Sequence, residues 1–282
     1  MKIVLPLRAE FGLKIWWFVP AVHGYEGRPK IVYIEPGEEA LYPSADMLIT
    51  IERQQDPLRR NRYARDRDFV AQIEAEARAT YGAHGAEYLK PDTTWPRKRF
   101  IPEPVVRDGI VCDVVVAPRK RLYGSAKNWP HWTTLINGLR AGGHRVFAAG
   151  APDSSYEVEI DHAWSRERYL DATIEALLSA RLVVATDAGI ANLAVLCGRP
   201  LLMITHGEGI VAPGPSVDET GRVMDLAYWP VKVERYREAN YLGSPIRLLY
   251  HAWEDPGLVI DTASRYLDLS KSFPWLSRGM SL

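Results

Sequence analysis

Short apolar runs alternate with amphipathic stretches along most of the chain. In the first third, apolar runs at residues 2–7, 30–35 and 47–52 predict β-strands, and the apolar stretch 15–22 predicts a helix. A second helix is expected where apolar residues recur at helical spacing. Its apolar face consists of Phe69, Val70, Ile73 and Ala77. Strands that alternate with helices indicate an α/β fold built on a parallel sheet.

The alternation is clearer in the second half of the chain. Buried strands are expected at residues 111–118, 144–150, 182–185 and 201–204, because each is a short apolar run. Three helices with one apolar face are also expected. Their apolar residues are, in chain order, Trp132, Leu135, Ile136 and Leu139; Leu170, Ile174, Leu177 and Leu178; and Val259, Ala263, Tyr266 and Leu267. This half is therefore expected to form a parallel sheet of its own.

A polar group of small residues, 186–189, separates the strand at 182–185 from an apolar helix at 190–197. Gly198 then ends the helix, and the strand at 201–204 follows. A turn at the carboxyl end of a parallel strand, opening onto a helix N-terminus, is where such sheets hold ligands. This turn is therefore the first candidate for a ligand site.

A stretch rich in proline and charge, residues 88–108, divides the two halves and is typical of a linker. We expect a first domain with its linker at 1–108 and a second domain at 109–255. A C-terminal helix and tail are expected at 256–282.

Composition narrows the function classes without selecting one. The 282 residues carry a formal net charge of zero, so no global field draws the protein to nucleic acid or membrane. Arginines gather at 59–67, 97–99 and 119–121. These stretches are either solvated faces or contacts for a phosphate-rich ligand.

The cysteines and the N-terminus indicate a cytoplasmic protein. Cys112 and Cys197 both lie in apolar runs, which is typical of buried thiols in a reducing compartment. The N-terminal residues do not have the pattern of a signal peptide, and the apolar stretch 15–22 is too short to span a bilayer.

Two turns of the second half are expected to converge at the carboxyl edge of its sheet. One follows residue 118 and carries Lys127, Asn128 and Trp129; the other is the 186–189 turn. A helix N-terminus offers unpaired N–H groups and partial positive charge, which suit a diphosphate. Lys127 either adds a mobile positive charge or is a solvated loop lysine.

Within the 186–189 turn, the residue types suggest different tasks. Ala188 and Gly189 are small, so an anion can approach the backbone there. Asp187 does not suit a phosphate. It is either an acceptor for sugar hydroxyls or the N-cap of the following helix.

Two segments of the second half resemble the bacterial heptosyltransferases of glycosyltransferase family 9. The segment "GSAKNWPHW" is similar to the family's Lys-x-Trp-Pro-like motif. The segment "ATDAGIANLAVLCGRP" is similar to its Asp-Thr-Gly-x-x-His-Leu-Ala-x-x-x-Gly-x-Pro motif. The resemblance covers about residues 111–215.

The resemblance implies an α/β protein of the GT-B fold, with two Rossmann-like domains facing each other across a cleft. It implies an inverting, metal-independent transfer of a sugar from a nucleotide diphosphate-sugar donor, with no cofactor. The donor is expected on the second domain. The first domain, at about a hundred residues, is shorter than is usual in the family.

The resemblance also assigns donor-binding roles to residues of both turns. These are Lys127, Asn128, Trp129, Thr186, Asp187, Ala188, Gly189, Asn192 and His206. Two positions depart from the motif, because Ala188 stands where the family often has threonine and Asn192 where it has histidine. Asn192 forms hydrogen bonds but cannot perform the proton chemistry of a histidine.

The first domain resembles the family only near its N-terminus, and the family's aspartate base is replaced around Leu13 and Lys14. Inversion needs a base that takes the proton of the acceptor hydroxyl. Glu10 is the nearest carboxylate and is the predicted catalytic base, with His23 and His206 as alternatives. Lys14 and Arg8 are expected to contact the acceptor or a phosphate.

Three functions stay open on the sequence alone. The first is the glycosyltransferase, with either a glycan or a hydroxylated base of DNA as acceptor. The second is a nucleotide-sugar epimerase. The third is a module that binds a nucleotide sugar without catalysis, which the missing aspartate favours.

Overall fold

The computed structural model describes residues 1–6, 14–51, 62–89, 98, 100–120, 128–150, 155–156, 158, 168–205, 216–217, 223–224, 242–249 and 252–272. For residues 16, 62–68, 216–217, 223–224 and 272 it describes the backbone alone. The chain forms two compact units, Met1–Val105 and Val106–Leu282. The division lies within the proline-rich stretch that the sequence marks as a linker.

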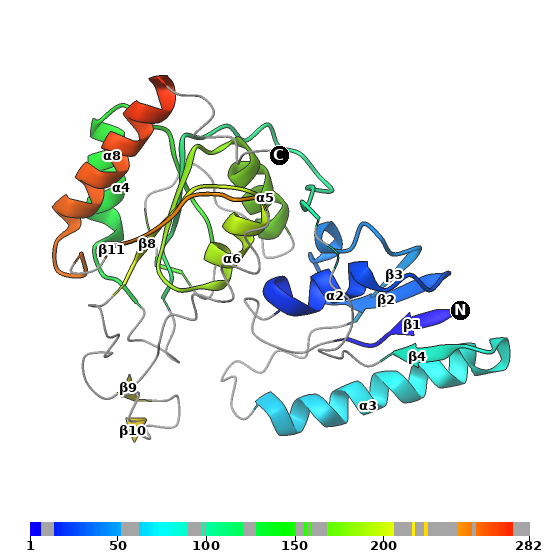
Figure 1. Cartoon of the computed structure of the whole chain (residues 1–282). Coiled ribbons are helices and arrows are strands. Elements are labelled where there is room, and N and C mark those ends of the chain that lie inside the picture. Colours follow the sequence, from blue (N-terminus) through cyan, green and yellow to red (C-terminus); the bar gives the residue numbers. More distant parts are fainter. Residues whose placement is uncertain are drawn as a thin grey trace. The chain divides into compact units, whose positions relative to one another are not determined.

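The first unit is built on a four-stranded parallel sheet (Figure 1). Its strands β1 (Lys2–Val4), β2 (Lys30–Ile34), β3 (Met47–Thr50) and β4 (Glu87–Leu89) follow the order β3-β2-β1-β4. The first three confirm the predicted strands. Strand β4 was expected to be the start of the linker. It was missed because it has three residues, of which only Leu89 is buried, so it leaves no apolar run.

Two helical segments accompany this sheet where the apolar pattern predicted them. A π-helical turn, η1 (Lys14–Phe18), continues into α2 (Val19–Gly24), and α3 spans Arg62–Tyr81. Two 3₁₀ turns, η2 (Glu39–Leu41) and η3 (Gly82–His84), complete the unit's described elements. Helix α3 buries Ile73 and Ala77 against Ile3, Ile31 and Tyr33 of the sheet.

The second unit contains a five-stranded parallel sheet with the order β11-β8-β7-β5-β6. Its strands are β5 (Val114–Ala117), β6 (Val146–Ala148), β7 (Leu182–Ala185), β8 (Leu201–Ile204) and β11 (Ile246–Leu249). A separate antiparallel pair joins β9 (Ser216–Val217) to β10 (Val223–Met224). Strand β11 was not predicted, because this edge strand fully buries only Leu249 and carries the exposed Arg247.

Helices cover both faces of this sheet (Figure 1). Helices α4 (Trp132–Ala141) and α8 (Pro256–Ser272) lie on one face, and α5 (Tyr169–Ser179) and α6 (Gly189–Leu196) on the other. The helix predicted within 256–282 thus belongs to the second unit. In the part of the chain that the structure describes, no helix is both long and apolar enough to cross a membrane.

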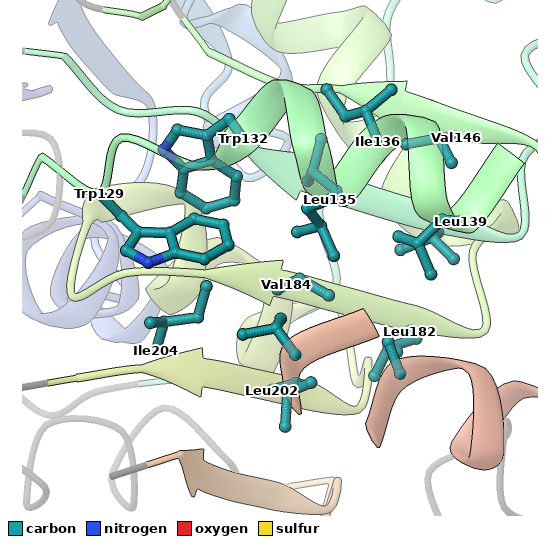
Figure 2. Packing of buried hydrophobic residues seen from close by; sticks show 14 of the residues in the cluster. Trp129, Trp132, Leu135, Ile136, Leu139, Val146, Leu182, Val184, Leu202 and Ile204 are labelled. Atoms are coloured by element: carbon teal, nitrogen blue, oxygen red, sulfur yellow. The ribbon is translucent and has the colours of Figure 1, made fainter. Parts of the chain in front are cut away.

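The core between the sheet and helices α4 and α8 is formed by alternate residues of the strands (Figure 2). Every second residue of a strand points to the same face, and this core takes Val114 and Val116 from β5 and Leu182 and Val184 from β7. Helix α4 contributes the apolar stripe that the sequence predicted. The stripe consists of Trp132, Leu135, Ile136 and Leu139. The sheet of the second unit is therefore fixed by packing on this face.

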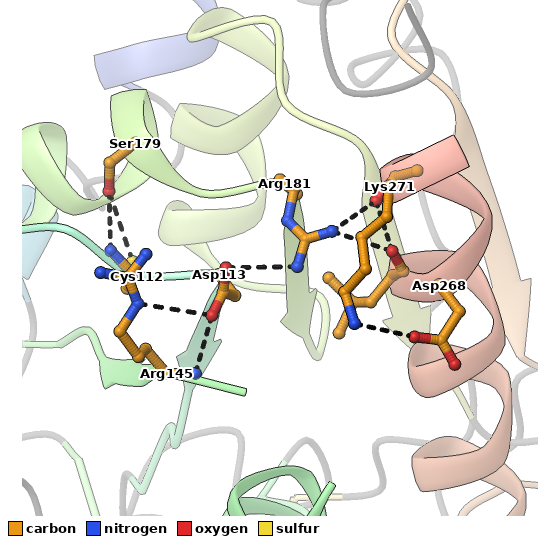
Figure 3. A network of polar contacts seen from close by, with 9 residues as sticks. Cys112, Asp113, Arg145, Ser179, Arg181, Asp268 and Lys271 are labelled. Carbon is orange, nitrogen blue, oxygen red and sulfur yellow. Dashed lines mark hydrogen bonds and ion pairs between the residues drawn. The ribbon is translucent and has the colours of Figure 1, made fainter. Parts of the chain in front are cut away.

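A polar network at the amino ends of the strands joins α8 to the sheet (Figure 3). The Arg181 guanidinium donates to Asp113 Oδ1 at 3.2 Å, to the Leu267 carbonyl at 2.9 Å and to Ser270 Oγ at 3.0 Å. The Arg145 backbone N–H donates to Asp113 Oδ2 at 2.9 Å. Burial raises the pKa of Asp113, but the Arg145 amide and the Arg181 guanidinium outweigh burial and hold that pKa below its ordinary value. The network stabilises the edge of the sheet opposite the carboxyl ends of the strands.

Replacing Arg181→Met is expected to lower the free energy of unfolding by about 2–3 kcal/mol, because it removes hydrogen bonds of a charged, mostly buried donor. The matched control is Lys271→Met on α8, the helix that Arg181 contacts, because the ion pair of Lys271 with Asp268 at 3.1 Å is largely exposed. The control should cost no more than about 0.5 kcal/mol. Chemical denaturation of both variants measures the difference, and equal losses would contradict this role of Arg181.

Candidate functional site

The second unit reverses its strand order between β5 and β7. The chain runs from β5 to β6 on one side and then returns to β7 on the other side of β5. In this register Ala117 lies opposite Ala185, so the segments that follow the two strands start side by side. Such a reversal point, at the carboxyl ends of parallel strands, is where open α/β sheets bind ligands. This agrees with the predicted convergence of the two turns.

The N-terminus of helix α6 opens at this reversal point. Ala188 occupies the N-cap, with extended backbone angles (φ −144°, ψ 171°), and its methyl side chain supplies no capping hydrogen bond. Its carbonyl accepts the backbone N–H of Ala191 at 3.1 Å and that of Asn192 at 3.4 Å. The first N–H groups of an α-helix have no intrahelical partner, so this end offers donors and partial positive charge to an anion.

Asp187 is therefore not the N-cap, and that interpretation of it is wrong. The position belongs to Ala188, one residue later, because the helix begins at Gly189. Asp187 is half-buried at the entrance to the helix. Its predicted role as an acceptor for sugar hydroxyls stays a prediction.

Two buried polar side chains line the lead-in and the first turns of α6. Thr186 is 1% exposed and Asn192 is fully buried. Within the described residues, Thr186 Oγ1 and Asn192 Oδ1 have no hydrogen-bond partner. A buried polar atom left unsatisfied costs about 1–3 kcal/mol, so these two atoms are expected to pair with a bound ligand or an ordered water.

Trp129 lies in the core and not at a ligand surface, so its predicted contact with the donor is wrong. Its indole is fully buried, and Nε1 donates to the Trp253 carbonyl at 2.8 Å. Its ring meets that of Trp132 edge to face, with centroids 5.0 Å apart (Figure 2). The tryptophan anchors the start of helix α4 in the core, because its large ring is buried there and its N–H has a carbonyl acceptor.

Asn128, next to Trp129, is half-buried shortly before α4. Its Oδ1 accepts a hydrogen bond from Arg119 Nη1 at 2.6 Å. Arg119 follows Ala117 of β5 by two residues, and its N–H donates to the Ala117 carbonyl at 2.7 Å. The structure thus places a guanidinium at the carboxyl end of β5. The sequence signal for it was the arginine run at 119–121, which was not assigned to the site.

Lys14 is a structural residue of the first unit, which corrects its predicted contact with an acceptor or a phosphate. It is 4% exposed, and its Nζ lies 2.7 Å from Glu38 Oε1 and 3.3 Å from Glu35 Oε1. Burial lowers the pKa of Lys14, but the two carboxylates outweigh burial and raise it above the ordinary value. A charge already paired twice inside the protein is not available to a ligand.

His23 is likewise a packing residue, so its interpretation as an alternative base is wrong. Its Nε2 lies 3.0 Å from the Leu41 carbonyl, and its ring centroid lies 3.9 Å from that of Phe100. Burial lowers the pKa of His23 to about 4, so the ring is neutral at pH 7 and donates to Leu41.

Four predicted site residues fall outside the described ranges. They are Arg8, Glu10, Lys127 and His206. Their roles stay predictions. The described members of the predicted donor site lie after β5 (Asn128) and from the end of β7 into α6.

Comparison with known proteins bears on the fold. No protein-family model and no curated protein sequence matches the chain. Among solved structures, the ADP-heptose lipopolysaccharide heptosyltransferase II of Escherichia coli is similar at a TM-score of 0.50 and 16% identity, over 96% of this chain and 99% of that one. The chain has the fold of the heptosyltransferases. A family 9 glycosyltransferase of Veillonella parvula is similar at a TM-score of 0.50 and 12% identity, over 95% of this chain and 97% of that one.

The resemblance noted in the two sequence segments is confirmed at the level of the fold. The heptosyltransferase fold accounts for the α/β organisation and for both parallel sheets. The match extends over nearly the whole of this chain and of each solved chain.

Because the buried His23 is neutral, the stability of the fold is expected to depend on pH. The folded chain holds His23 neutral down to about pH 4, whereas an unfolded chain protonates it near pH 6.5. The unfolded state therefore binds the extra proton in this window, and stability is lost as the pH falls from 6.5 towards 4. At pH 5 the loss amounts to about 2 kcal/mol.

His23→Gln keeps a donor for the Leu41 carbonyl and removes the titration. The drop in unfolding free energy between pH 7 and pH 5 should be smaller in this variant by about 2 kcal/mol. Denaturant titrations of both proteins at the two pH values measure the drop. An equal drop in wild type and variant would refute the assignment of a neutral, buried His23.

Proposed function

We propose that this protein is a glycosyltransferase whose donor is a sugar nucleotide, with the donor diphosphate bound at the N-terminus of α6. The observation that supports it is the position of that N-terminus. It opens at the reversal point between β5 and β7, with an N-cap residue that cannot satisfy its N–H groups. The heptosyltransferase fold makes a sugar donor the first ligand class to test.

Each part of the described site fits one part of such a donor. The N–H groups at the start of α6 suit the diphosphate, and Ala188 and Gly189 leave the backbone open to it. Arg119, held by Asn128, adds positive charge at the end of β5. We propose that Lys127 adds a second cation and that Asp187 accepts hydrogen bonds from sugar hydroxyls. The similar E. coli enzyme is named for ADP-heptose, which is therefore the first donor to try.

We further propose that the transfer is a single displacement with inversion. The acceptor hydroxyl attacks the anomeric carbon, the bond from that carbon to the diphosphate oxygen breaks, and a base takes the hydroxyl proton. Glu10 is the proposed base, with His206 as the alternative. The proposed reaction needs no metal ion, because the helix N-terminus and the cations compensate the charge of the leaving diphosphate. A glycan or a hydroxylated DNA base is the proposed acceptor, and the GT-B arrangement and a cytoplasmic location are part of the same proposal.

The test is slow hydrolysis of the donor in the absence of an acceptor. Wild-type protein is incubated with ADP-heptose and with ADP-, UDP- and GDP-linked hexoses, with and without EDTA, and release of nucleoside diphosphate is followed. We expect release from at least one donor and no effect of EDTA. Binding without release would favour a module that lost its catalysis, and a product isomerised at C2 would favour an epimerase. Binding of none would refute the proposal.

Ala188→Asp separates the ligand role of the α6 N-terminus from its structural role. An aspartate at the N-cap accepts the N–H groups of the first turn and should stabilise the protein by about 1 kcal/mol. The same carboxylate occupies the anion site, so affinity for the nucleoside diphosphate should fall about 10- to 100-fold. Ala188→Ser, which caps without charge, is the control and should lose less affinity. Calorimetry and thermal unfolding measure both effects, and a stabilised variant with unchanged affinity would contradict the assignment.

A further inference from the structure

Of the two unsatisfied atoms beside the α6 N-terminus, Asn192 Oδ1 is the one that the diphosphate does not explain, because the Thr186 hydroxyl is also able to donate to a phosphate oxygen. Asn192 Oδ1 and Thr186 Oγ1 are both buried and, in the part of the chain that the structure describes, unpartnered. A diphosphate at neutral pH offers only acceptor oxygens. An amide oxygen is also an acceptor, so it gains nothing from a phosphate.

The orientation of the Asn192 amide is assigned from the contact of its nitrogen. Asn192 Nδ2 donates to the Ala188 carbonyl at 3.4 Å. The opposite amide orientation would set an oxygen against that carbonyl oxygen, two acceptors facing each other, so Oδ1 is the atom left over. Helical side chains lean towards the N-terminus of their helix, which is why this amide reaches the N-cap residue.

Thr186 belongs to the same place in the fold. It follows the last residue of β7 directly and precedes the N-cap by two residues. Its hydroxyl can donate or accept, whereas Asn192 Oδ1 only accepts. Both residues are therefore buried polar groups at the anion-binding end of α6, here called the polar pair, and Asn192 Oδ1 needs a hydrogen-bond donor.

We propose that Thr186 and Asn192 bind the hydroxyl groups of a sugar ring attached to the diphosphate, with a ring hydroxyl donating to Asn192 Oδ1. The inference rests on the proposed function and deepens it, because it selects phosphate-linked polyols over phosphates that carry no hydroxyl. Both the ribose of the nucleotide and the transferred sugar supply this chemistry. In this proposal Thr186 and Asn192 determine which ligand the site prefers, and the helix N-terminus binds the anion.

The experiment compares three ligands that contain the diphosphate with increasing numbers of hydroxyls. They are inorganic pyrophosphate, the nucleoside diphosphate and its sugar nucleotide, each titrated into wild type and into Thr186→Val. Valine keeps the shape of threonine and lacks its hydroxyl. We expect affinity for the sugar nucleotide to fall about three- to tenfold, as for one lost neutral hydrogen bond, with affinity for pyrophosphate unchanged.

The three ligands also tell the sources of the hydroxyl apart. A loss confined to the sugar nucleotide assigns the pair to the transferred sugar, and an equal loss for nucleoside diphosphate and sugar nucleotide assigns it to the ribose. An equal loss for all three ligands, or for none, overturns the inference. Failure of wild type to bind any of them overturns the proposed function with it. Asn192→Ala is a second variant, with the same expected pattern.

Thermal unfolding of the ligand-free protein tests the inference without a measurement of ligand affinity. Removing an unsatisfied buried hydroxyl should stabilise the fold, so Thr186→Val should raise Tm by about 2–4 °C. The matched control is Thr173→Val in α5, which is equally buried but donates its hydroxyl to the Tyr169 carbonyl at 2.6 Å. The control should not raise Tm. A destabilised Thr186→Val together with unchanged ligand preference would show that the hydroxyl has a structural partner, and would overturn the inference.

Discussion

The parallel pairing of β5 with β7 decides where every described group of the candidate site lies. Since Ala117 stands opposite Ala185, the loop that carries Arg119 and the turn that leads into α6 leave the sheet at the same edge. The apolar packing on α4 and α8 and the Arg181 network fix this register from the opposite edge and face. The position of the site is therefore set by interactions that lie away from the place where a ligand would bind.

Helix α6 has local features that do not favour the stability of the fold. Its N-cap is an alanine, and the buried Thr186 and Asn192 each present an atom without a described partner. A sequence selected only for a stable fold would place serine or aspartate at the cap and apolar residues at the buried positions. Such departures from local consistency are expected where a protein binds something. They agree with a site that accepts an anion and hydroxyl groups together.

The sequence predicted the strand–helix–strand unit at 182–204 because its apolar runs are strong and Gly198, with φ 70°, ends the helix as expected. The sequence analysis did not predict the edge strands β4 and β11, because each has only one buried residue and so leaves no apolar run. Lys14 and Trp129 were wrongly predicted to contact a ligand, because the prediction considered residue type and motif position alone. The partner of Lys14, Glu38, lies 24 residues along the chain, and the carbonyl that binds Trp129 lies 124 residues away. Such long-range pairing leaves no local signal in the sequence.

The most direct test of the account is the response of the α6 amides to a nucleoside diphosphate. In the deuterated, ¹⁵N-labelled 31.8 kDa protein, the backbone resonances of Gly189 and Ile190 are followed during titration with ADP, UDP and GDP, and with the matching monophosphates and nucleosides. These first-turn N–H groups should shift most with a diphosphate, less with its monophosphate and not with the free nucleoside. A diphosphate that binds and leaves both resonances unmoved would contradict the account.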